Sequence, residues 1–345
     1  MREAAFPSTD EAVLRRLARP SFAERLGLLW RERRFRRRAR PLPTLRPAGA
    51  APVAVAPDAI VLVCVMRNAA PYLPAFLEHY RRLGIARFAV VDDRSDDGTR
   101  ELLDAAPDVD RFESQLSFRE VGGSMGWRDA LVARYGRNRW YVSVDADEFL
   151  LYPDSETRPL AAFVADLERA GLRRSLGPML DLYPRGALGA AVLHPGQHPL
   201  AVSPLIDGEG YRISRERIGT SIWGGPRTRL FGGENRLSKF PVIFVDEATQ
   251  FSGGTHHAPL PLARNFAVPT CALLHFKFSA ASLGEFRAFV AEGAHFGGSA
   301  FYRRIVESGV FGADLDLAYE GSLPVGATQE LVRRGFMTDL ARGAV

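Results

Sequence analysis

The stretch AIVLVCVMRNAAPYLPAFLEHYRRLGIARFAVVDD (Ala59–Asp93) decides the fold class of this sequence. It starts with an apolar run of the length of a buried strand, and Ile85–Asp93 has the pattern of a second strand. Between them, Pro71 suits the first turn of a helix and Gly84 suits its end. We therefore expect a strand–helix–strand unit whose two strands lie parallel in one sheet.

The alternation of strands and helices continues as far as the apolar run WYVSVD (Trp140–Asp145). This order predicts an α/β protein with a doubly wound, mostly parallel sheet that carries helices on both faces. After Pro153 the pattern is less regular. Residues 184–270 are rich in Gly and Pro, and Cys271–Phe278 is one more apolar strand before a helical C-terminal region.

The composition is that of an ordinary globular protein. The chain has 345 residues, of which 46% are hydrophobic and 25% charged, and this is enough material for a large core. Its two cysteines, Cys64 and Cys271, lie in apolar segments and cannot build a disulfide framework, so we expect a reducing compartment. No apolar run approaches the roughly 20 residues of a membrane span, and no signal-peptide pattern opens the chain. We expect a cytoplasmic protein.

The first forty residues are strongly basic and end in RERRFRRRAR (Arg31–Arg40). We expect short helices here, with either a solvated basic face or mobile arm, or a peripheral contact with an anionic membrane surface. The membrane interpretation depends on the apolar residues just upstream, which are Phe22, Leu26, Leu28, Leu29 and Trp30. No reader motif supports nucleic acid as a partner.

In an open parallel sheet, ligands bind beyond the carboxyl ends of the strands. A dinucleotide-binding fold needs a glycine fingerprint after its first strand, and MRNAAPYLP (Met66–Pro74) contains no glycine. The polar residues that we expect at the strand ends are Arg67, Asn68, Asp92, Asp93, Asp145, Asp147 and Glu148.

Asp145 and Asp147 are separated by one residue, so both can reach one hard cation. Mg²⁺ or Mn²⁺ held in this way neutralises a diphosphate and stabilises it as a leaving group. The alternative is a capped turn with solvated carboxylates.

These motifs together resemble the GT-A-type glycosyltransferases, most closely the family-2-like inverting enzymes. The resemblance rests on IVLVCVMRN with the following YLPAFLEHY, on VVDDRSDDGTRELL and on VDADEFL. It covers residues 59–153 well and residues 271–278 more loosely. It implies a nucleotide-diphosphate sugar as donor and a carbohydrate or glycoconjugate as acceptor.

The resemblance also implies roles for single residues. Asp92 or Asp93 would bind the nucleoside. Asp145 and Asp147 would bind ribose and metal, and His275 would complete the metal or diphosphate site.

Further residues extend this predicted site. Lys277 lies two residues after His275, hence on the same side of a strand, and needs an anion there, which is either a diphosphate or a structural carboxylate. If it is a diphosphate, Lys277 and Arg67 would add positive charge to the site. Before the fourth strand, GGSMGWRDALVARYG lacks the asparagine-rich form of the family. There Trp127 and Arg128 either replace it by stacking or phosphate pairing, or simply begin a helix.

The acceptor side offers weaker candidates. We expect Arg227 and Arg229 on one strand face, with Lys239 beyond a hairpin, and His257 in GTHHAP as a remote candidate. An inverting transfer needs a general base near the acceptor hydroxyl. The candidates for this base are Asp181, which we prefer, then Glu148 and Asp207.

The resulting hypothesis is a metal-dependent, inverting glycosyltransferase. The alternatives are a nucleotidyltransferase that acts on a sugar phosphate, and a non-catalytic adaptor that binds anions or a membrane surface. The expected organisation is a basic helical extension (1–40), a Pro/Ala-rich linker (41–58), a nucleotide-sugar-binding half (59–153), an acceptor-side half (154–280) and C-terminal helices (281–345).

Overall fold

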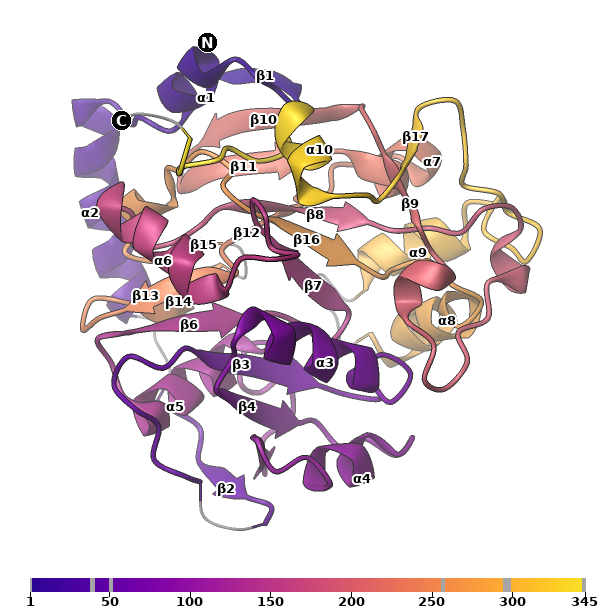
Figure 1. Ribbon diagram of the computed structural model, residues 1–345, viewed down its shortest axis with the longest axis horizontal. Coiled ribbons are helices and arrows are strands. Elements are labelled where there is room, and N and C mark those ends of the chain that lie inside the picture. Colours follow the sequence, from indigo (N-terminus) through magenta and orange to yellow (C-terminus); the bar gives the residue numbers. More distant parts are fainter. Residues whose placement is uncertain (1, 38–40, 50–51, 256–257, 294–298, 343–345) are drawn as a thin grey trace.

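The computed structural model describes residues 2–37, 41–49, 52–255, 258–293 and 299–342. A six-stranded sheet forms its first half, seen in the lower part of Figure 1, with strand order β13-β6-β3-β4-β5-β2. The four central strands are parallel, and the two edge strands run antiparallel to their neighbours. These strands are β2 (Leu45–Pro47), β3 (Val61–Met66), β4 (Arg87–Asp92), β5 (Val109–Ser114), β6 (Arg139–Ser143) and β13 (Val242–Val245).

Helices lie on both faces of this sheet because alternate side chains of its buried strands point to opposite faces. Leu62 and Cys64 of β3 belong to the same apolar cluster as helix α3 (Leu73–Leu83). Val61 and Val63 belong to the cluster on the other face, which contains Trp127 and Leu131 of helix α5 (Met125–Tyr135). A short helix, α4 (Thr99–Asp104), connects β4 to β5.

A second, four-stranded sheet has the order β12-β8-β16-β7. Strand β16 runs antiparallel to β7 and parallel to β8. These strands are β7 (Glu148–Leu151), β8 (Gly177–Asp181), β12 (Ser238–Lys239) and β16 (Ala272–His275).

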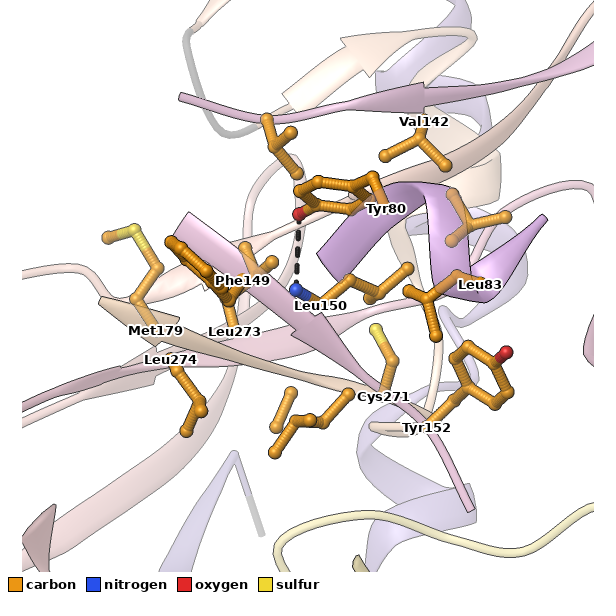
Figure 2. Close-up of a cluster of buried hydrophobic side chains, with 14 of the residues drawn as sticks. Tyr80, Leu83, Val142, Phe149, Leu150, Tyr152, Met179, Cys271, Leu273 and Leu274 are labelled. Carbon is orange, nitrogen blue, oxygen red and sulfur yellow. Dashed lines mark hydrogen bonds between the residues drawn. The ribbon is translucent and has the colours of Figure 1, made fainter. Parts of the chain in front are cut away.

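The two sheets share one apolar core through α3, as Figure 2 shows. Phe149 and Leu150 of β7 and Leu273 of β16 are fully buried, and a buried side chain of this size contributes about 1.5–3 kcal/mol. The Tyr80 hydroxyl donates to the Glu148 carbonyl at 2.9 Å. It accepts from the Leu150 amide at 3.1 Å, the bond drawn in Figure 2. These two bonds fix β7, and with it the start of the second sheet, against α3.

Smaller elements complete the molecule. One three-stranded sheet brings the N-terminal strand next to residues 211–223, and two strand pairs lie at the periphery. These strands are β1 (Glu3–Phe6), β9 (Leu205–Asp207), β10 (Tyr211–Glu216), β11 (Gly219–Trp223), β14 (Gln250–Thr255), β15 (Ala258–Leu260) and β17 (Ser322–Pro324). The remaining helices are α1 (Glu11–Leu17), α2 (Phe22–Arg37), α6 (Leu160–Arg169), α7 (Gly225–Phe231), α8 (Ser282–Glu292), α9 (Ala300–Val306) and α10 (Thr328–Arg333), with 3₁₀ turns at Leu188–Ala190, Pro199–Ala201 and Leu262–Asn265.

The protein is therefore a mixed α/β structure with parallel and antiparallel sheets, as the sequence predicts at this level. Its assignment to the doubly wound GT-A type remains a prediction. One local prediction was wrong: Arg227 and Arg229 lie on helix α7 and not on a strand. Within the described ranges, no helix is both long and apolar enough to span a bilayer.

Candidate functional site

The chain crosses from the first sheet to the second at the Asp-x-Asp motif. Strand β6 ends at Ser143, the loop contains Asp145 and Asp147, and β7 begins at Glu148. The side chains of Asp145 and Asp147 keep 32% and 26% of their surface exposed. The Glu148 side chain behind them is buried. The motif thus presents two accessible carboxylates above a buried one.

Asp145 is held by two cations. One oxygen accepts from Arg128 Nη2 at 2.5 Å, and the other accepts from Lys239 Nζ at 2.6 Å. Lys239 also contacts Glu148 Oε1 at 2.5 Å. Arg128 is buried and additionally donates to the carbonyl of Val63, so it connects the motif to the neighbouring strand β3. The sequence-based pairing of Arg128 with a phosphate is replaced here by a pairing with Asp145.

Three titratable side chains form one row across the second sheet. His275 of β16 lies in register with Glu148 of β7 on one side and with Asp181 of β8 on the other. Because directly opposed residues of adjacent strands face the same side, these three side chains lie on one face of the sheet. His275 Nδ1 lies 2.5 Å from Asp181 Oδ1, and its Nε2 lies 3.3 Å from Asp147 Oδ2.

Lys277 brings a second positive charge to Asp147, with 3.7 Å between Nζ and Oδ2. Burial alone would raise the pKa of Asp147, but His275 and Lys277 together hold it below its ordinary value. Lys277 in turn lies within 6 Å of aromatic rings from helices α8 and α9, which enclose its ammonium group. These rings are Phe286, Phe289 and Tyr302.

Arg227 completes the cluster from helix α7. Its Nε donates to Asp181 Oδ2 at 2.6 Å, and its guanidinium carbon lies 5.3 Å from the centre of the Phe301 ring. Its Nη2 is buried and has no hydrogen-bond partner among the described residues. A buried donor of this kind favours an anionic ligand beside it.

Asp181 and Glu148 are unsuited to take a proton from an acceptor. Asp181 is fully buried, and both its oxygens are occupied by His275 and Arg227. Glu148 is fully buried as well; burial raises its pKa, and its Oε2 accepts from the Asp145 amide. Both residues orient the cations around the Asp-x-Asp motif.

The end of strand β4 lies in the six-stranded sheet, next to strand β3. Asp92 is buried and accepts from Arg100 Nε at 2.9 Å and from the Ser95 amide at 3.3 Å. Asp93 is partly exposed, and burial raises its pKa. Asn68 on the adjacent loop accepts from the Asp96 amide. Of the two acids, Asp93 has the more accessible carboxylate.

Arg67 follows strand β3 and forms an ion pair with Glu292 of helix α8 at 3.3 Å. Helix α8 therefore reaches across to the carboxyl end of the parallel strands. A helix that contacts this edge and also encloses Lys277 limits the space in which a ligand can lie.

The geometry suits two of the three predicted metal ligands, Asp147 and His275. With Nδ1–H donated to Asp181, His275 presents Nε2 as a ligand beside Asp147, and a carboxylate behind a ligating histidine is the usual support for a bound metal. Asp145 does not fit, since both its oxygens are occupied by cationic side chains. Within the described part of the chain, no cluster of three or more acidic, histidine or cysteine side chains surrounds one point.

Other predicted residues lie elsewhere. Trp127 is fully buried in the first turn of helix α5, which agrees with the alternative of a helix start and not with stacking on a nucleotide. Asp207 is buried and paired with Arg229 at 2.8 Å and with the Tyr183 hydroxyl at 2.8 Å. His257 lies outside the described residues.

Sequence reasoning missed the aromatic side chains of α8 and α9, as well as Glu285. Burial raises the pKa of Glu285, and the charges of Lys277 and Asp147 also act on it. The sequence contained one weak signal for this region, the spacing of Phe286 and Phe289 on one helix face.

No family model and no curated protein matches the chain. Among solved structures, it is similar to the crystal structure of 4-diphosphocytidyl-2C-methyl-D-erythritol synthase, at 15% sequence identity and a TM-score of 0.30. The similarity covers 65% of this chain and 91% of the other. A similarity of this extent carries no argument about function, which rests here on the geometry of the site.

Proposed function

We propose that the protein transfers a glycosyl group from a nucleotide-diphosphate sugar to a carbohydrate or glycoconjugate acceptor. The observation that carries this proposal is the set of charged side chains around Asp147. It lies in the loop that follows a central parallel strand, between His275 and Lys277 of the second sheet. Ligand sites of such sheets lie at this end of the strands.

The donor diphosphate would bind beside Asp147. Lys277 supplies positive charge, and Arg227 Nη2, which has no hydrogen-bond partner among the described residues, supplies a buried donor for its oxygens. A divalent ion on Asp147 and His275 would add the charge stabilisation that a diphosphate leaving group needs. Asp145, which both Arg128 and Lys239 neutralise, would contact the ribose.

The nucleoside would extend toward strand β4. We assign its contact to Asp93 in preference to Asp92, whose carboxylate is buried and paired with Arg100. For the general base we replace Asp181 and Glu148 by Glu285. The charges of Lys277 and Asp147 act on its carboxyl group, and desolvation raises its pKa above the ordinary value, which makes it a stronger base than an ordinary glutamate.

The test is a thermal-shift panel of nucleoside diphosphates, with and without Mn²⁺, followed by turnover of the matching nucleotide sugars. A ligand at a hundredfold excess over its Kd stabilises the folded state by about 2.7 kcal/mol. We expect one diphosphate to give such a shift, which Asp147→Asn abolishes together with turnover. The control Asp104→Asn changes an exposed partner of Arg111 and should keep both.

The outcomes separate the alternatives. Full turnover by Asp147→Asn, or no shift with any diphosphate in folded protein, contradicts the proposed site. Consumption of a nucleoside triphosphate with release of pyrophosphate identifies a nucleotidyltransferase instead. Turnover that persists in EDTA removes the metal from the proposal but leaves glycosyl transfer, with Lys277 and Arg227 as the remaining positive charges.

A further inference from the structure

Among the described residues, the contacts of helix α2 with the body of the protein come from one of its faces. Leu28 is buried in a small apolar cluster with Leu260 and Leu262. Glu32 accepts a hydrogen bond from the Leu262 amide at 2.5 Å, and Arg36 donates to the Ala248 carbonyl at 2.6 Å. These contacts fix the orientation of the helix and therefore determine which of its side chains face outward.

The outward face carries four large apolar side chains. Phe22, Leu26, Leu29 and Trp30 are 78%, 55%, 64% and 64% exposed. Their spacing of four, three and one residues places them on one side of the helix. Single exposed apolar residues are common on protein surfaces, but a contiguous group of this kind marks an interaction site.

Positive charge surrounds this apolar stripe. The exposed arginines of the helix are Arg25, Arg33, Arg34, Arg36 and Arg37. Its two acidic residues are engaged by the protein: Glu24 accepts from the Ser21 amide and contacts Arg215, and Glu32 binds the Leu262 amide. The outward face of α2 thus combines apolar and cationic side chains without an acidic one.

We propose that the outward face of α2 binds the surface of an anionic lipid bilayer. In an interfacial helix, the apolar side chains enter the boundary between head groups and acyl chains, while the arginines contact the lipid phosphates. A second copy of this chain fits less well, because a symmetric contact would set one group of arginines against another. Nucleic acid would leave the four apolar side chains exposed.

This proposal goes beyond the proposed function and does not depend on it. Helix α2 lies at the left edge of the molecule in Figure 1, whereas α8 and α9, which border the candidate site, lie on the right. A bilayer on α2 therefore leaves the candidate site open, and the two proposals can fail separately.

The test is co-sedimentation of the full chain with phosphatidylcholine vesicles that contain or lack phosphatidylglycerol. We expect binding to the anionic vesicles alone, and a loss of binding at high salt. Leu29→Ser/Trp30→Ser should lower the partition coefficient at least about tenfold. Arg33→Gln/Arg34→Gln/Arg37→Gln should lower it about a hundredfold, since each basic residue near the surface contributes about fivefold.

Matched controls change exposed residues elsewhere. Val192→Ser/Val310→Ser and Arg185→Gln/Arg217→Gln/Arg287→Gln alter exposed apolar and basic positions and should bind like the unmodified chain. Circular-dichroism melts establish that each variant is folded. The proposal is overturned if the unmodified chain does not bind anionic vesicles, or if Leu29→Ser/Trp30→Ser binds them equally well. A concentration-dependent dimer that this double variant abolishes would assign the surface to a second copy instead.

Discussion

The ends of strands β4 and β6 lead into the acidic residues Asp92, which is buried, and Asp145, which is partly exposed, and the two are neutralised by different means. At β4, Asp92 pairs with Arg100, eight residues later in the chain. At β6, Asp145 pairs with Lys239, 94 residues later, in another sheet. The first acid caps a local loop. The second also has a nearer partner in Arg128, and its bond to Lys239 joins the two sheets.

This difference has an energetic consequence. Lys239 is buried, and its ammonium group contacts Asp145 and Glu148 at the same time. Burial alone would lower the pKa of Lys239, but these two carboxylates hold it above its ordinary value. Removal of one member of a buried ion cluster leaves the others desolvated and unpaired.

The largest expected effect is therefore that of Lys239→Met on stability. Loss of the ammonium group leaves Glu148 buried beside Asp145, and we expect a cost of roughly 3–5 kcal/mol. Urea unfolding at neutral pH measures this cost. The double variant Lys239→Met/Glu148→Gln removes the uncompensated charge and should recover part of it. If Lys239→Met alone costs less than about 1 kcal/mol, the buried cluster does not join the two sheets.

The next effect concerns pH and the strand that follows the Asp-x-Asp motif. His79 of α3 is buried, and its Nε2–H donates to the Leu150 carbonyl of β7 at 2.9 Å. Burial lowers the pKa of His79 to about 4 from its ordinary value of 6.5. Between these pH values the unfolded chain binds the extra proton, so stability is complete above pH 6.5 and falls as the pH decreases toward 4.

The variant His79→Gln separates this effect from the site. Glutamine can still donate to Leu150 but does not titrate, so the variant should lose about 3 kcal/mol less stability than the unmodified chain across this pH range. Asp147 contributes little there, because its carboxylate is ionised in the folded chain and still mostly ionised in the unfolded chain above its ordinary pKa of 3.8. Unfolding at a series of pH values measures the difference. The control is His194→Gln, which changes an exposed histidine. Parallel stability–pH curves for His79→Gln and the unmodified chain would contradict the assignment.

At β4 the expected effect is smaller. The Arg100 side chain is 41% exposed, so water can replace it at Asp92, which also keeps its bond from the Ser95 amide. We expect Arg100→Ala to cost about 1 kcal/mol. A cost equal to that of Lys239→Met would remove the contrast between local and long-range neutralisation.

The same contrast explains how much of the molecule could be predicted. The strand–helix–strand unit and the position of the acids at the strand ends follow from local patterns, and both are present in the structure. The positions of Asp147 and His275 were also predicted to be close, but this rested on a family resemblance. Nothing in the local sequence indicates that Asp145 pairs with Lys239 or that Asp181 is closed off by Arg227.

The predicted general base, Asp181, shows why such pairings could not be predicted from the sequence. Asp181 follows an apolar strand, which suggests an exposed strand end. In the structure β8 is an inner strand, and helix α7 places Arg227 on the carboxylate. Both facts depend on which strands become neighbours, and the irregular segment 184–270 carries no periodic signal for that. The rotation of α2 is likewise set by contacts of Leu28 and Glu32 with the body.

The smallest expected effect is at the end of β3. Arg67 and Glu292 form an ion pair whose side chains are 52% and 42% exposed, and exposed pairs contribute little because water and salt screen them. Glu292→Ala should therefore change the free energy of unfolding by less than about 0.5 kcal/mol. The same variant releases Arg67 from helix α8. If Arg67 belongs to the diphosphate site, the variant should bind a nucleoside diphosphate at least as tightly as the unmodified chain. A weaker thermal shift at unchanged stability would show that Glu292 orders this edge for the ligand, and that the β3 end also depends on a long-range partner.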